Sequence, residues 1–140
     1  MIECVDFSAS LFSLLIVFRQ VAKLEPTSSV PLRRCGVMLL ERLSWARAHQ
    51  FDVDAARLLQ TAADRLQRAE NIEAGSGAFF LACVAALRDR VADARHWLEL
   101  TLQVCRPAVL PTRREVDANV WLKSMRALPW FIQWRSKLPQ

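Results

Sequence analysis

The chain contains 140 residues, of which 53% are hydrophobic and 24% are charged. This length and composition suit one globular domain with a core of its own, and they exclude a disordered chain. The formal charge is +5, and residues 77–140 account for the excess, with ten Lys or Arg against five Asp or Glu. A net charge of this size is ordinary for a soluble protein, so it does not by itself predict nucleic-acid binding.

Helix-forming residues dominate the sequence. Ala, Leu and Arg are abundant and favour helices, whereas the chain has only three Gly and no Tyr. No alternation typical of strands stands out. We therefore expect an all-α fold of about seven helices, in which short connections make neighbouring helices antiparallel.

The first predicted helix spans residues 6–24, with Asp6 or Ser8 as its N-cap. Its apolar centre, LFSLLIVF at 11–18, is too short to span a membrane. The acidic residues that precede this centre are wrong for a secretory signal. We expect this helix to belong to a soluble, cytoplasmic protein.

One side of this helix carries a stripe of large apolar residues, which are Leu11, Leu14, Leu15, Phe18 and Val21. Phe12 and Ile16 lie on other sides, so the middle of the helix is apolar almost all round. A helix at the end of a small helical stack should instead have a solvated outer face. We therefore predict that the first helix lies in an interface, most simply in a homodimer or otherwise with a partner protein, with Leu11, Leu15 and Phe18 in contact with that partner.

Two longer helices are predicted next in the chain. The segment EPTSSVP at 25–31 breaks the first helix, and the second starts with Pro31 in its first turn and runs through residue 49. The third follows Asp52 or Asp54 as its cap and ends at the segment EAGSG, residues 73–77.

Residues 78–88 and 91–105 are predicted to form a tight pair of short helices. Small residues allow the two helices to approach closely, and large apolar residues fill the remaining space. The small residues are Ala82, Ala85, Ala86 and Ala94, and the large ones are Leu81, Leu98 and Leu102. After a loop at 107–113, two further short helices are predicted at 114–127 and 129–138.

The stretch from 78 to 134 resembles the tetratricopeptide (TPR) family of helical repeats. The residues that match the repeat are Leu81, Ala82, Ala94, Leu98 and Thr101, with Pro107 one position late. Asp89 stands in place of the turn Gly of the family, and Ala85 in place of its mid-helix aromatic residue. The tail resembles the helix pair that closes many TPR arrays, through Asp117, Leu122, Met125, Arg126, Pro129 and Phe131.

The resemblance implies a short TPR-like solenoid of stacked antiparallel hairpins forming one domain over residues 1–140. Its parts would be an N-terminal apolar helix at 1–30, a degenerate pair at 31–76, a TPR-like hairpin at 77–107 and capping helices at 108–140. It also implies a protein-binding function as an adaptor, an assembly factor or a dedicated chaperone, for example of a bacterial secretion system.

Little in the sequence predicts catalysis. His49 and His96 lack a carboxylate or Cys at ligand spacing, although Asp93 could contact His96 on one helix face. The four Cys residues are far apart, which predicts free thiols in a reducing compartment. We expect no catalytic residue, no metal and no cofactor.

The C-terminal region combines aromatic and basic residues. The residues that could bind a partner there are Trp121, Arg126, Trp130, Trp134 and Arg135. The rings could bury the last helices, or anchor a protein partner, because Trp and Arg are common at interface hot spots. They could also stack on bases, so a nucleic-acid-associated protein is the alternative function.

Overall fold

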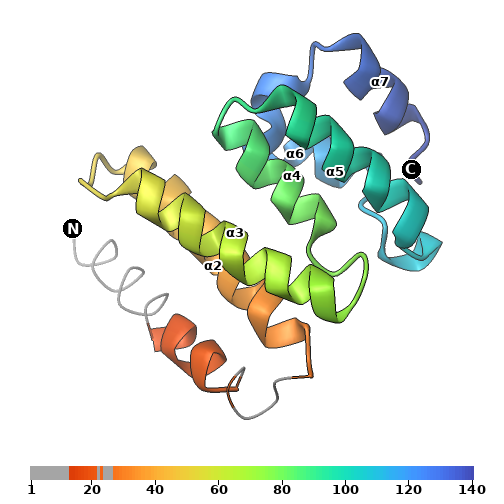
Figure 1. Cartoon of the computed structure of the whole chain (residues 1–140). Coiled ribbons are helices and arrows are strands. Elements are labelled where there is room, and N and C mark those ends of the chain that lie inside the picture. The colour runs from red at the N-terminus through yellow and green to blue at the C-terminus, as the bar shows by residue number, and fades with distance from the viewer. Residues whose placement is uncertain (1–12, 22, 24–26) are drawn as a thin grey trace. The chain divides into compact units, whose positions relative to one another are not determined.

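The computed structural model describes residues 13–21, 23 and 27–140, and every regular element among these residues is helical. The all-α fold class predicted from the sequence is therefore confirmed. The chain divides into two compact units, residues 1–73 and 74–140 (Figure 1). The boundary lies beside the predicted turn at 73–77.

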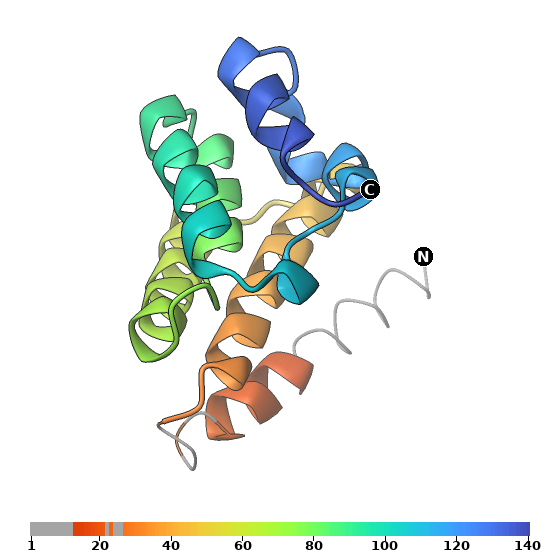
Figure 2. The same ribbon diagram turned by 90° about the vertical axis from the view of Figure 1, so that its right-hand side faces the viewer.

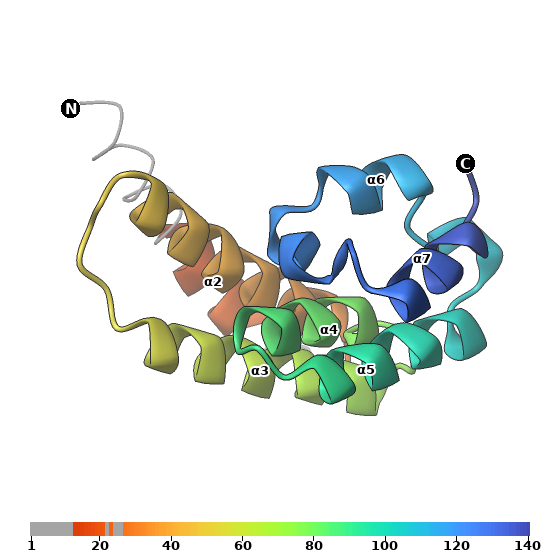
Figure 3. The same cartoon turned by 90° about the horizontal axis from the view of Figure 1, so that it is seen from above.

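The first unit consists of a helical segment at residues 13–21 and 23, followed by α2 (Val30–Ala48) and α3 (Ala55–Ile72). Helices α2 and α3 pack as an antiparallel pair (Figures 1 and 3). The described part of the first helix lies beside α2 (Figures 1 and 2). The predicted caps Asp6 and Ser8 lie outside the described residues.

The ends of α2 and α3 follow local signals in the sequence. Pro31 stands in the first turn of α2, where its missing N–H costs no hydrogen bond. Asp54 caps α3, because its carboxylate accepts a hydrogen bond of 3.1 Å from the backbone N–H of Arg57. Both predicted helices are thus confirmed, and of the two candidate caps the structure uses Asp54. The hydroxyl of Ser29 also donates a hydrogen bond of 2.8 Å to Glu73 near the other end of the pair.

A glycine sets how closely α2 and α3 approach each other. A Cβ atom at Gly36 would lie only 2.5 Å from Cγ and 2.7 Å from Cδ2 of Leu66. Leu66 is fully buried, so its side chain has little room to move. Further apolar residues of both helices complete the core of this unit: Leu32, Cys35, Leu39, Leu40, Leu43, Leu59, Ala62 and Ala69.

The second unit begins with the predicted pair of short helices, α4 (Ala78–Leu87) and α5 (Val91–Val104), which pack against each other. Ala82 and Ala94 are both completely buried. Asp89 connects the helices with a φ of 58°, the left-handed conformation that a turn glycine adopts most easily.

The C-terminal region contains four short elements: η1 (Pro107–Val109), α6 (Arg113–Ala118), η2 (Val120–Met125) and α7 (Pro129–Ser136). Element η2 packs on α4, and α7 packs on α5 and α6. Thr112 and Glu115 form a capping box at the start of α6. Helix α7 begins at Pro129, as predicted.

The prediction of one continuous helix at 114–127 is wrong. Asn119 has an extended backbone, and its side-chain oxygen accepts hydrogen bonds from the N–H groups of Trp121 (2.8 Å) and Leu122 (3.1 Å). An Asn side chain that caps the following residues competes with the helical hydrogen bonds. It therefore ends α6 and starts a separate 3-10 helix.

We predict that Gly36→Ala destabilises the chain, because the overpacking against Leu66 costs about 1–3 kcal/mol and outweighs a gain in helix propensity of up to about 1 kcal/mol. In a Leu66→Ala background the space is open, so the same change should become stabilising. Urea unfolding of the parent, the two single variants and the double variant measures this change of sign. An effect of the same sign in both backgrounds would contradict the close approach.

We also predict that Ala94→Leu destabilises the chain by about 1–3 kcal/mol, because the completely buried site between α4 and α5 cannot hold a larger side chain. Ala92→Leu is the matched control, since Ala92 is exposed on the same helix. That control should change the unfolding free energy by less than about 0.5 kcal/mol. Equal urea midpoints for the two variants would exclude the predicted crossing.

Candidate functional site

The first helix exposes a group of large apolar side chains. Leu14, Ile16 and Val17 are 42%, 41% and 51% exposed, and we call these three residues the outer apolar face. Leu15, one of the predicted partner contacts, is instead buried in the chain at 3% exposure, and Phe18 is half-buried. Leu11 lies outside the described residues. The helix therefore has apolar residues both toward the chain and away from it.

The C-terminal tryptophans mainly build the second unit. Trp134 is 3% exposed, and its indole N–H donates a hydrogen bond of 2.6 Å to the carbonyl of Leu98 on α5. The ring of Phe131, also buried, lies 5.5 Å from Trp134 and 6.0 Å from Trp130 between ring centroids. The sequence left open whether these rings pack in the core, anchor a protein partner or stack on bases. Trp134 packs in the core.

Trp121 and Trp130 are only half-buried. Trp121 meets Phe80 of α4 edge to face, with ring centroids 6.4 Å apart. The guanidinium of Arg95 lies 5.7 Å from the ring centroid of Trp130, and Arg95 also forms an ion pair of 2.8 Å with Glu99. Both tryptophans therefore keep part of their surface in solvent while they contact their own unit.

The two basic residues predicted to bind a partner also make contacts within the chain. Arg135 forms a bidentate ion pair with Asp117, with N–O distances of 2.6 and 2.5 Å. The hydrogen bonds from Arg135 lower the pKa of Asp117 and raise that of Arg135. Arg126 donates a hydrogen bond of 3.0 Å to the carbonyl of Asn119. These contacts connect the short C-terminal elements to one another.

Two of the cysteine thiols, the side chains that could act as nucleophiles or metal ligands, are buried in the protein. Burial raises the pKa of the Cys83 thiol, and a hydrogen bond from Asn119 opposes that shift only in part. Burial likewise raises the pKa of Cys35, against the charges of Arg65 and Arg19. A thiol with a raised pKa stays protonated and is a poor nucleophile. Cys35, Cys83 and Cys105 form no disulfide, and Cys4 lies outside the described residues.

The two histidines contact aromatic rings. His49 stacks on Trp45 at 4.7 Å between centroids, and its Nδ1 lies 2.9 Å from the Trp45 carbonyl. His96 is exposed and meets Trp97 edge to face. Across the described part of the chain, no group of three His, Cys, Asp or Glu side chains could hold a metal ion. No helix within that part is long and apolar enough to cross a membrane.

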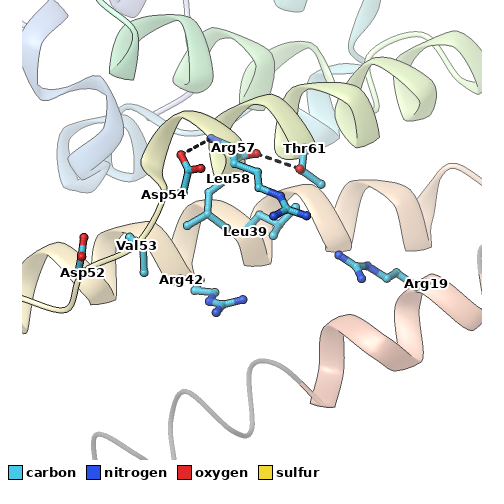
Figure 4. A pocket seen from close by; sticks show the side chains of 9 residues that line it. All are labelled: Arg19, Leu39, Arg42, Asp52, Val53, Asp54, Arg57, Leu58 and Thr61. Carbon is cyan, nitrogen blue, oxygen red and sulfur yellow. Dashed lines mark hydrogen bonds between the residues drawn. The ribbon is translucent and has the colours of Figure 1, made fainter.

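A pocket of about 370 Å³ lies in the first unit, among the first helix, α2 and α3 (Figure 4). Three arginines line it: Arg19 from the first helix, Arg42 from α2 and Arg57 from α3. Leu39, Val53 and Leu58 supply apolar walls, and Asp52, Asp54 and Thr61 complete the lining. Sequence reasoning missed this pocket, because its residues come from three separate helices and a loop and follow no motif.

Comparison with known proteins gives no relative for this chain. No family model, no curated protein and no solved structure matches it.

We predict that Trp134→Phe destabilises the chain by about 1–3 kcal/mol, because the carbonyl of Leu98 loses the indole N–H at a buried position. Trp130→Phe is the control: this residue is half-buried, and a Phe ring keeps the contact with Arg95. Urea unfolding should separate the two variants clearly. A loss at Trp130 as large as that at Trp134 would contradict the assigned role of the hydrogen bond.

Proposed function

We propose that this chain is a protein-binding helical module, acting as an adaptor, an assembly factor or a dedicated chaperone, without catalysis of its own. The observation that carries the proposal is the outer apolar face, Leu14, Ile16 and Val17, on one short helix. Large apolar side chains that lie together on a protein surface mark places where another molecule binds. Since about half of each side chain is still exposed, covering the remainder with a partner would contribute roughly 1 kcal/mol per residue.

The α4–α5 pair and the elements after it support a TPR-like character for the second unit. Ala82, Ala94, Leu98 and Thr101 are all buried at the positions that the resemblance assigns to packing. Asp89 has the left-handed conformation expected where the family has its turn glycine. However, α2 and α3 have 19 and 18 residues against 10 and 14 for α4 and α5. We therefore limit the proposed TPR-like arrangement to residues 78–134.

A second copy of the chain is the simplest partner for the outer apolar face. A two-fold axis brings the same surface of two protomers together, and an apolar face is complementary to itself. The face has no charged residue among its three members. Association through it would be driven by the removal of apolar surface from water.

Nucleic-acid association through the basic C-terminal surface is the alternative, and it has less support. Base stacking needs accessible rings, whereas Trp134 is buried and Trp121 contacts Phe80. Arg135 is paired with Asp117. Salt-sensitive binding of oligonucleotides by the purified chain would favour this alternative.

We predict that the purified chain forms dimers as its concentration rises, and that Val17→Glu shifts it to monomers. The introduced carboxylate would have to lose its hydration in the interface, which costs more than the contact contributes. Val109→Glu is the matched control, because Val109 is an exposed valine at 67% exposure in the other unit. Light scattering coupled to size exclusion measures the mass of each protein. A parent chain that is monomeric at every concentration would contradict dimerisation through this face.

A further inference from the structure

The arginine-lined pocket of the first unit has an uneven distribution of charge. Figure 4 shows the guanidinium groups of Arg57 and Arg19 turned toward each other, whereas Asp52 lies toward the opposite end. The carboxylate of Asp54 is already engaged by the backbone N–H of Arg57. Neither Arg19 nor Arg57 has an ion pair with a carboxylate among the residues that the structure describes.

Two like charges facing one space repel each other, and an anion placed between them would convert that repulsion into attraction. A guanidinium presents its N–H donors in a planar fork that fits the oxygens of a carboxylate or a phosphate. Both side chains are exposed, so they can adjust to a ligand without unfolding the unit. We propose that this pocket is a binding site for a small oxyanion-bearing ligand, whose charged head lies between Arg19 and Arg57.

The remaining walls restrict the rest of the ligand. Among the apolar lining residues Leu39 is buried, and Val53 and Leu58 are half-buried, so a short apolar body can lie against them. Asp52 and Asp54 repel a second anionic group at their end. The volume of about 370 Å³ lies in the lower part of the range of small-molecule sites. Both carboxylates and phosphate esters carry the negatively charged oxygen atoms that this site requires.

A bound anion would also connect two elements of the unit. Arg19 belongs to the first helix and Arg57 to α3, so one ligand would hold the first helix to the α2–α3 pair. This site is separate from the outer apolar face, since none of Leu14, Ile16 and Val17 lines the pocket. The proposal therefore does not depend on dimerisation or on a protein partner.

The experiment is isothermal titration calorimetry of the full chain at low salt, with sodium butyl phosphate in one arm and sodium hexanoate in the other, since each probe carries one oxyanion head and a short apolar body. We expect saturable binding of at least one probe with Kd below about 1 mM. The probe with the lower Kd shows whether the site prefers a phosphate or a carboxylate. Arg57→Gln and Arg19→Gln should each weaken that binding by about ten-fold or more, because each removes charge-assisted hydrogen bonds.

Arg68→Gln is the matched control, since Arg68 is exposed on α3, does not line the pocket and gives the same change of net charge. It should leave Kd within about two-fold of the parent value. Circular dichroism checks that each variant keeps its helices. Absence of saturable binding up to about 10 mM of both probes would overturn the proposal. A loss at Arg68→Gln equal to that at Arg57→Gln would also overturn it, because it would show attraction to net charge alone.

Discussion

Close approach between paired helices is the constraint on which both units depend. In the first unit, the absence of a side chain at Gly36 makes room for Leu66. In the second unit, Ala82 and Ala94 are completely buried within the α4–α5 pair. Interiors are packed as densely as organic crystals, so a helix held this closely cannot rotate or slide without a clash. The register of each pair therefore determines which faces remain for other elements to cover.

The C-terminal segment covers a face of α5 that the α4–α5 pair leaves open. Helix α7 has only eight residues, and a helix of that length is not stable in water by itself. Its burial of Phe131 and Trp134, with the indole hydrogen bond to Leu98, attaches it to α5. The ion pair between Arg135 and Asp117 is exposed, so it contributes orientation more than stability. Folding thus explains the burial of Phe131 and Trp134, whereas Trp121 and Trp130 remain half-buried.

The sequence predicted the elements that carry strong local signals. Prolines, cap residues and small-residue spacing located α2, α3, α4, α5 and α7 to within about two residues. The break at Asn119 was missed, because apolar periodicity continues across it and the competing side-chain hydrogen bonds depend on the folded geometry. The inward direction of Leu15 was also beyond prediction, since a helix that is apolar all round has no unique buried face. The pocket needed the tertiary structure, because Arg19 and Arg57 are remote in sequence.

The first helix contributes residues to both proposed binding sites. Leu15 and Arg19 are four residues apart, so they lie on one side of the helix, where Leu15 is buried and Arg19 reaches the pocket. Leu14 and Val17 lie on the side that faces away. Leu15 is the one apolar side chain that is fully buried among the described residues of this helix, and its burial contributes about 1.5–3 kcal/mol to the attachment. Phe18 and Val21 are half-buried and add to it.

An oxyanion held by the exposed Arg19 would add up to about 1 kcal/mol to that attachment, because solvent screens the contact. A ligand that favours the attached helix must also favour any partner that needs the helix in that position, and the effect on the two affinities must be equal. A helix with a charged anchor on one side and an apolar face on the other is therefore suited to make protein binding depend on a small anion.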